Sequence, residues 1–381
     1  MKKRIFALIL AMAMAMNLAA CGSGKMQSET HVSAEENKTS AEAEEAENKE
    51  EAAAQTDNET YVFTDDLGRD VEVPKNISRI VPSAPLAQIV LTAIAPEMFV
   101  GLGAKLTDSS KGVLPDYLFE LPFFGSLYAG PELNVEELAM TEPQLIIDIG
   151  EPKPSSKEDL DALEEQTLIP SVYISASLKG MPETYRKLGK LLGKEEKAEE
   201  LAAFCEKVYN RTASIMEKVG DNKVDCIYVI GEDGLNVLAK DSYHAELLDM
   251  LTNNLVVVDN PISKGSGNEV TMEQISVWNP EFVIFGPGSI YSTVKENETW
   301  SKIDAIINDR YVEVPSVPYN WMNMPPSVQR YLGLIWLTAE LYPEYCDYDV
   351  KEEIKEYFKL FYDCDLSDEE YNSITANAFL K

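Results

Sequence analysis

The chain has 381 residues and a formal net charge of −32 at pH 7, from 33 lysines and arginines against 65 aspartates and glutamates. This charge makes nucleic acid an implausible partner, because phosphate backbones bind cationic surfaces. Apolar residues make up 45% of the chain, which is enough to build two ordinary domains after residue 60.

The N-terminus has the three parts of an export signal. Residues 2–4 are charged, residues 5–16 are apolar, and Leu-Ala-Ala stands directly before Cys21. The apolar run is too short to span a bilayer comfortably, and no other segment approaches about 18 uninterrupted apolar residues. The cleavage region resembles a bacterial lipobox, so we predict that residues 1–20 are removed and that Cys21 carries a lipid anchor. A secreted protein cut after Ala20, with an incidental cysteine, is the alternative.

Residues 21–59 are rich in Glu, Ala, Asn, Ser and Lys and contain no aromatic residue. Such a segment cannot bury enough surface to fold, so we predict a disordered acidic stalk. The remainder divides into an N-terminal α/β lobe at 60–178, a connecting helix at 179–220 and a C-terminal α/β lobe at 221–381.

In the first lobe, strands alternate with helices, which predicts a largely parallel sheet. Ser83 is placed to cap the first predicted helix. The predicted elements are a hairpin at 61–64 and 71–73, strands at 79–81, 98–102, 123–126, 145–149 and 172–174, and helices at 85–94 and from 135.

Residues 181–219 repeat apolar side chains at helical spacing, with Gly193 as the one weak point. We predict one long helix, bent at Gly193, between the lobes. In the second lobe we predict strands at 224–230, 235–239, 256–258, 282–285 and 311–314, and helices at 243–251 and 327–341. The predicted fold class is therefore α/β, with two Rossmann-like lobes joined by one long interdomain helix.

Two distant stretches, 136–147 and 273–284, read almost alike. Each opens with a glutamate in a short helix, stops before Pro143 or Pro280, and continues into an apolar run suited to a buried strand. Local convergence is the alternative, but the pattern favours a repeated half-fold, and two similar α/β lobes usually bind something between them.

Several motifs together resemble the solute-binding lipoproteins of ABC importers, in the helical-backbone group that receives iron-siderophore, haem and cobalamin. They are Thr-Asp-Asp-Leu-Gly-Arg-Asp-Val-Glu-Val-Pro at 64–74, Arg-Ile-Val at 79–81, the two repeat helices, and the segment 325–336. The resemblance implies an extracytoplasmic protein that works with a permease and its cytoplasmic ATPase. It also implies one glutamate per lobe that docks on permease arginines, which are Glu136 and Glu273 here; Glu137 is an alternative to Glu136.

Ligands of open α/β lobes lie outside the carboxyl ends of the strands. The residues that we expect there are Ser83, Ser126, Tyr128, Glu151, Tyr243, His244, Lys264, Ser289, Tyr291, Tyr319, Trp321 and Met322. These aromatic, apolar and hydroxyl side chains suit a metal chelate, namely a ferric siderophore, haem or a corrinoid, bound as cargo and not as a cofactor. A small oxyanion such as molybdate or tungstate, and a tethered adhesin or sensor, are the alternatives.

His244 is the only histidine of the predicted lobes; it could ligate iron or cobalt, but a helix-capping role is favoured. One histidine cannot supply the converging ligands of a zinc or manganese receptor. No cysteine lies in a C-x-x-C pair, although Cys346 and Cys364 could form a disulfide. The chain contains no G-x-S-x-G, phosphate-loop or H-E-x-x-H motif, so we predict a binding protein and not an enzyme.

Overall fold

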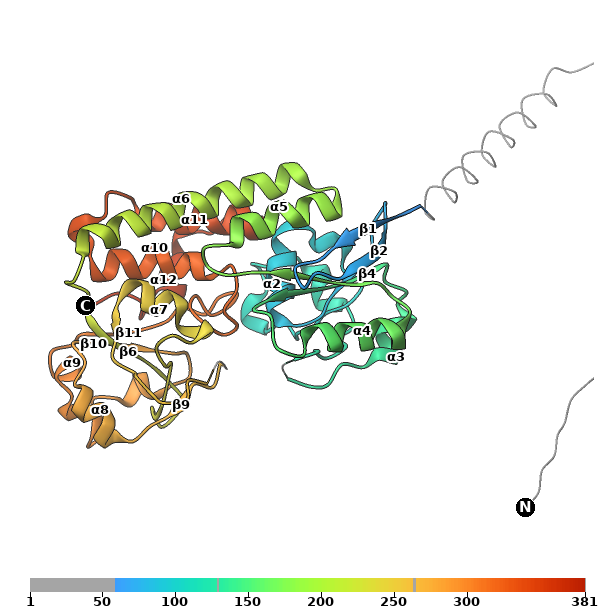
Figure 1. Ribbon diagram of the computed structural model, residues 1–381. Coiled ribbons are helices and arrows are strands. Elements are labelled where there is room, and N and C mark those ends of the chain that lie inside the picture. Colours follow the sequence, from blue (N-terminus) through green and yellow to red (C-terminus); the bar gives the residue numbers. More distant parts are fainter. Residues whose placement is uncertain (1–58, 129, 263–264, 381) are drawn as a thin grey trace, which may run out of the picture. The chain divides into compact units, whose positions relative to one another are not determined.

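The computed structural model describes residues 59–128, 130–262 and 265–380 (Figure 1). The predicted signal peptide, Cys21 and nearly all of the predicted stalk lie outside these residues. The described part opens with the predicted hairpin, in which β1 (Thr60–Thr64) pairs antiparallel with β2 (Asp70–Pro74). Its turn needs a left-handed residue, which Gly68 supplies with φ of 75°.

The sheet of the first lobe is parallel, as predicted, with the order β3-β4-β5. Its strands are β3 (Ile80–Pro82), β4 (Leu145–Gly150) and β5 (Ser171–Ser175). The helices of this lobe are α2 (Pro85–Ile94), α3 (Val135–Met140) and α4 (Ser156–Thr167). Both faces of β4 are buried, because helices and loops cover both sides of a parallel sheet.

Three local predictions in this lobe are wrong. Residues 98–102 and 123–126 are not strands; they contribute the isolated bridges Ile80–Phe99, Leu102–Phe123 and Ser126–Glu132. Ser83 does not cap α2, whose N-cap is Ala84, because the Ser83 hydroxyl donates to the Asp148 carboxylate instead.

The connecting region is two helices and not one bent helix. α5 (Met181–Leu192) ends at Gly193, which is left-handed with φ of 64°, and the chain turns back into α6 (Glu195–Val219). The two helices pack against each other so closely that a Cβ on Gly189 would lie 2.5 Å from the Cβ of Ala198. The 25-residue α6, about 37 Å long, is the element that runs from one lobe to the other (Figure 1).

The second lobe has a mixed sheet of order β11-β10-β6-β7-β9, with β8 also paired to β6. The parallel strands are β6 (Asp225–Ile230), β8 (Asn253–Asn254), β10 (Phe282–Phe285) and β11 (Tyr311–Glu313). The short strand β7 (Asn236–Val237) pairs antiparallel with β6 on one side and with β9 (Asn268–Glu269) on the other. The strand predicted at 256–258 is absent, although Val256 is fully buried.

Six helices complete the described part of the second lobe: α7 (Glu246–Leu251), α8 (Met272–Trp278), α9 (Asp304–Ile307), α10 (Arg330–Leu341), α11 (Val350–Tyr362) and α12 (Asp368–Ile374). The helix predicted at 243–251 begins as a 3₁₀ turn at Tyr243–Ala245, and the helix predicted from 327 begins at Arg330. Cys346 and Cys364 are free thiols.

One hydrophobic core extends through both lobes. It joins Ile80 and Leu145 of the first sheet, Leu201 of α6, Phe282 of the second sheet and Trp336 of α10, all fully buried. A smaller cluster lies on the other face of the second sheet, and another lies beneath α3 and α4. The lobes are therefore not independently packed bodies, since α6 and α11 each pack against both α2 of the first lobe and α10 of the second.

Candidate functional site

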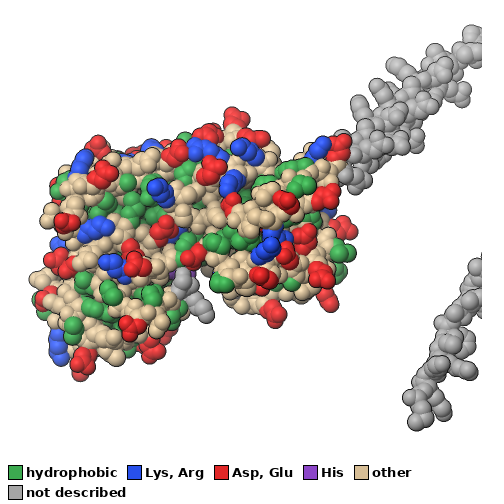
Figure 2. Space-filling view, in the orientation of Figure 1, with side chains coloured by type: hydrophobic (Ala, Val, Ile, Leu, Met, Phe, Trp, Pro, Cys, Tyr) green, Lys and Arg blue, Asp and Glu red, His purple; other side chains and the backbone are tan. Residues whose placement is uncertain are grey.

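The main cavity has a volume of about 610 Å³ and lies between the lobes, where the surface is hollowed (Figure 2). It is lined by Ala84, Pro85, Leu86, Tyr128, Asp148, Ile149, Gly150, Glu151, Lys153, Tyr243, His244, Gly265, Met324, Pro325 and Pro326. The first-lobe residues follow the carboxyl ends of β3 and β4, as expected for ligand sites in open α/β sheets. The second lobe contributes the turn before α7 and the segment that leads into α10.

The first-lobe wall of the cavity contains a buried carboxylate. Asp148 is 3% exposed and accepts a hydrogen bond from the Ser83 hydroxyl. Burial raises the pKa of Asp148, and the hydrogen bond from Ser83 opposes that rise. The Lys153 ammonium lies 3.2 Å from the centroid of the Tyr128 ring, and burial lowers the pKa of this lysine. With Glu151, which also lines this wall, the wall combines two acidic side chains, one lysine and one aromatic face.

The second-lobe wall contains His244, whose role differs from the predicted helix cap. Its Nδ1 lies 3.0 Å from the backbone oxygen of Asn323. A carbonyl oxygen only accepts hydrogen bonds, so Nδ1 carries the proton and Nε2 keeps its lone pair. Burial lowers the pKa of His244 to about 4, which keeps the ring neutral at physiological pH. A carbonyl partner of this kind fixes the tautomer and the ring orientation, as it does for metal-binding histidines in other proteins.

Tyr243 connects the cavity to the junction of the lobes. Its hydroxyl donates to the backbone oxygen of Ala176, at 2.8 Å, and burial raises its pKa to about 12. Beneath its ring lies the fully buried Arg330, with the guanidinium carbon 5.2 Å from the ring centroid. Arg330 binds Glu246 at 2.8 Å, and Glu246 accepts the backbone N–H of Leu178 at 3.0 Å. Tyr243 and Glu246 thereby hold the segment that leaves β5.

The structure brings four of the predicted ligand residues to the cavity: Tyr128, Glu151, Tyr243 and His244. Ser83 and Ser126 are buried beside it and do not line it. Lys264 lies outside the described residues, next to Gly265 of the lining.

The other five predicted residues do not line the cavity: Ser289, Tyr291, Tyr319, Trp321 and Met322. Tyr291 packs edge-on against Phe285 in the smaller cluster on the outer face of the second sheet. Trp321 is fully buried, and its Nε1–H donates to the backbone oxygen of Val317. The rings of Tyr291 and Trp321 therefore fill the core and do not face the cavity.

Sequence reasoning missed the polar wall formed by Asp148 and Lys153, and the apolar rim of Leu86, Met324 and Pro325. Asp148 did leave a signal, because it is the one charged residue in an otherwise apolar strand. A charge at such a position needs a partner, which is either a neighbouring side chain or a ligand.

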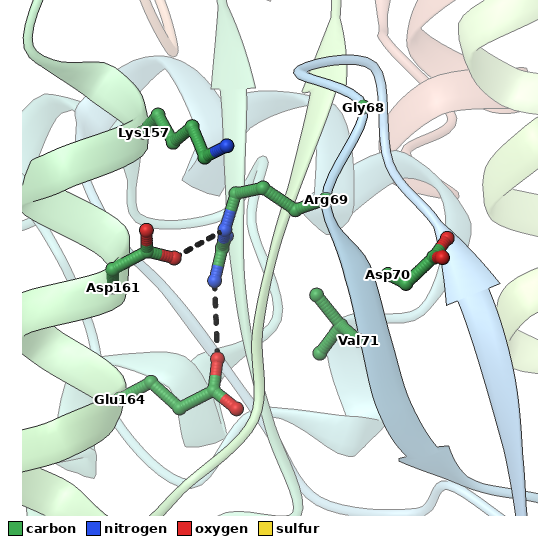
Figure 3. A pocket seen from close by; sticks show the side chains of 7 residues that line it. All are labelled: Gly68, Arg69, Asp70, Val71, Lys157, Asp161 and Glu164. Atoms are coloured by element: carbon green, nitrogen blue, oxygen red, sulfur yellow. Dashed lines mark hydrogen bonds and ion pairs between the residues drawn. The ribbon is translucent and has the colours of Figure 1, made fainter.

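A second cavity, about 380 Å³, lies at the first-lobe hairpin (Figure 3). Its central residue, Arg69, is 6% exposed and binds Asp161 through Nε, at 2.7 Å, and Glu164 through Nη2, at 3.1 Å. Its Nη1 donates to Asp65 and to the backbone oxygen of Ser171. All three nitrogens are therefore engaged in fastening the hairpin to α4 and β5, which indicates a structural role.

The two predicted docking glutamates occupy the same position in two equivalent helices. Glu136 is the second residue of α3 and Glu273 the second residue of α8, and both are exposed. Within the described part of the chain, neither carboxylate makes a hydrogen bond or ion pair. Glu137, by contrast, accepts a hydrogen bond from Asn134 at 3.1 Å. It matches Gln274, which completes a capping box with Thr271.

Among the described residues, no group of three or more His, Cys, Asp or Glu side chains is placed to hold a metal ion. Nor does any helix in this part of the chain have the length and hydropathy needed to cross a bilayer.

Comparison with known proteins identifies relatives over most of the chain. A family model described as periplasmic binding protein matches residues 126–318. The solved ABC transporter solute binding protein from Sulfurospirillum deleyianum is 26% identical, with a TM-score of 0.77 over 83% of this chain and 99% of that chain. A periplasmic solute binding protein from Veillonella parvula is 25% identical, with a TM-score of 0.70 over 84% of this chain and 98% of that chain.

The molybdate-binding periplasmic protein MolA of a Haemophilus influenzae ABC transporter is more distant. It is 18% identical, with a TM-score of 0.63 over 81% of this chain and 99% of that chain, a likeness that shows the fold alone. A search of curated proteins finds no match.

Proposed function

The chain belongs to the periplasmic binding protein family, and from this premise we propose that it is a lipid-anchored receptor that captures a metal chelate between its lobes for an ABC importer. Members of this family are extracytoplasmic solute-binding proteins of transporters and not a class of enzyme, and they deliver small ligands to a permease with its ATPase. Beyond family membership, we propose three things: that the ligand is a metal chelate, that a lipid anchors the protein, and that named glutamates dock on the permease.

The size and lining of the main cavity carry the proposal. A volume of about 610 Å³ falls within the range of roughly 300–1,000 Å³ that holds a whole small molecule. A bare tetrahedral oxyanion would fill only a small part of that space. The faces of Tyr128 and Tyr243, with Leu86, Met324 and the prolines, suit a bulky ligand that has apolar edges.

The charges of the lining favour a chelate of low negative charge. Among the described lining residues, Lys153 is the one cation, against the carboxylates of Asp148 and Glu151. A tricatecholate with several negative charges would meet repulsion there, whereas a hydroxamate chelate or a corrinoid would not.

His244 is the proposed contact to the metal. Its neutral ring is held by Asn323 and retains a lone pair on Nε2. An imidazole nitrogen is a suitable ligand for an open coordination position on chelated iron or cobalt. Tyr128 and Tyr243 would then contact the organic part of the chelate.

The proposed attachment and delivery use residues outside the cavity. Cys21, which lies outside the described residues, would carry the lipid, and the acidic segment that follows would tether the lobes to the membrane surface. Glu136 and Glu273 would dock on cationic side chains of the permease, and their equivalent, unpaired positions support that role.

The test is ligand retention by the chain from residue 22 onward. The purified protein is incubated with a ferric hydroxamate, haem, cobalamin and molybdate, freed of unbound material, and examined by absorption spectroscopy and metal analysis. We expect a retained chelate chromophore. His244→Ala should shift its metal absorption band and weaken binding about tenfold or more, whereas Ser289→Ala, outside the cavity, should change neither. Retention of molybdate alone would replace the proposal with an oxyanion receptor.

A further inference from the structure

Two large apolar side chains stand exposed at matching places on the two lobes. Met140 of α3 is 82% exposed and Val277 of α8 is 79% exposed. The same helices bury Leu138 and Ile275 completely. The helices are therefore well seated on their lobes, and the exposed side chains point away from the core.

The equivalence of these positions follows from the repeat. Asn134 and Thr271 cap the two helices, and the free glutamate stands two residues later in each. Met140 and Val277 lie four residues after Glu136 and Glu273, so each apolar side chain lies on the same helix face as its glutamate, about one turn away. The pairing of an unpaired carboxylate with an exposed apolar side chain thus occurs once on each lobe.

A single exposed apolar residue needs no explanation, since such residues are common on protein surfaces. Exposure of a large apolar side chain at the equivalent position of both repeat helices does need one. Figure 1 shows α3 and α8 on the side of the two lobes away from α6, so a single partner can reach both. That partner must present two similar sites, each with a cation for the carboxylate.

We propose that Met140 and Val277 are apolar anchors through which the two lobes dock on the permease. Each side chain enters an apolar socket beside the cation that binds Glu136 or Glu273. The inference rests on the proposed function and extends it, because it assigns permease contacts beyond the glutamates. Apolar side chains buried at the centre of a contact, next to a paired charge, account for much of the affinity of protein interfaces.

Photo-crosslinking on the full lipoprotein in its own membrane tests the contact directly. A benzophenone side chain is placed at position 140 or 277, and in matched controls at Leu168 or Val257, which are 87% and 72% exposed. We expect adducts at 140 and 277 that mass spectrometry identifies as a membrane-spanning ABC permease, and none at the control positions. Adducts at 140 and 277 with a second copy of this chain, or with any other protein, would overturn the inference.

The same experiment separates this inference from the docking proposal. Permease adducts from positions 136 and 273, with none from 140 and 277, would refute the apolar anchors and leave glutamate docking intact. No permease adduct from any of the four positions would refute both.

A functional readout gives the expected size of the effect. Loss of one anchor should weaken permease binding roughly tenfold, the equivalent of about 1.4 kcal/mol. Met140→Ser with Val277→Ser should therefore lower binding to membranes containing the permease on the order of 100-fold, while ligand affinity and melting temperature stay unchanged. Met140→Leu with Val277→Leu should restore it. Binding equal to that of a Leu168→Ser, Val257→Ser control would count against the anchors.

Discussion

Replacing Arg69 with methionine tests the role assigned to the first-lobe hairpin. Methionine keeps the apolar stem of the side chain and removes the charge, so the change isolates the ion pairs. Arg69 binds Asp65 at 3.3 Å, Asp161 at 2.7 Å and Glu164 at 3.1 Å. The Asp65 side chain is fully buried, whereas those of Asp161 and Glu164 are 55% and 38% exposed.

The exposed fractions of the three carboxylates decide how much stability the Arg69→Met variant loses. The carboxylates of Asp161 and Glu164 regain water when Arg69 is lost, and surface pairs of this kind contribute only about 0–1 kcal/mol. Asp65 stays buried, and breaking a buried pair costs about 3–5 kcal/mol. Its oxygens retain the backbone N–H donors of Leu67, Arg69 and Tyr173, which moderates the loss. We expect the free energy of unfolding to fall by about 3 kcal/mol.

Urea unfolding, followed by circular dichroism, measures the change. The matched control is Arg186→Met, because Arg186 also binds two carboxylates, Glu199 and Glu206, but at a surface where those side chains are 59% and 46% exposed. That variant should lose less than about 1 kcal/mol. Adding Asp65→Asn to Arg69→Met should recover part of the loss by removing the unpaired charge. Equal losses for Arg69→Met and Arg186→Met would refute the reasoning.

Two further predictions concern the second lobe. His244 has a pKa of about 4 when folded and about 6.5 when unfolded, so the unfolded chain binds more protons between these values. Stability should fall by up to about 3 kcal/mol as pH drops from 6.5 to 4, and unfolding of His244→Gln should lack that part of the pH dependence; an unchanged profile would contradict the assignment. Gly333→Ala should destabilise the protein by about 2 kcal/mol, although alanine favours helices, because its Cβ would lie 2.5 Å from the Trp321 oxygen; a higher urea midpoint would contradict this.

The sequence predicted the fold correctly wherever a residue pattern was compatible with only one local structure. Alternating strands and helices predicted the parallel sheet of the first lobe, and the Pro143 and Pro280 stops identified the repeat that β4 and β10 share. Gly193 was recognised as a weak point. Helical spacing on both sides of it could not distinguish a bend from a reversal, since both keep the same apolar faces buried.

The sequence predicted where the candidate site lies, but not which residues line it. The rule that ligands lie beyond strand ends led to Tyr128, Glu151, Tyr243 and His244. It could not separate an aromatic that lines the cavity from one such as Trp321, which fills the core three residues before Met324 of the rim. Which side of a loop a ring faces depends on the packing of distant segments, and local spacing does not encode it.

The core that both lobes share has a thermodynamic consequence. Because α6 and α11 pack against both lobes around one buried cluster, separating the lobes would expose that cluster to water. Denaturation should proceed as one cooperative step, so ligand binding should raise the free energy of unfolding of both lobes together. A ligand present at a hundred times its dissociation constant would add about 2.7 kcal/mol to that step. Heating the protein with candidate solutes, one at a time, then becomes a sensitive screen for the cargo itself.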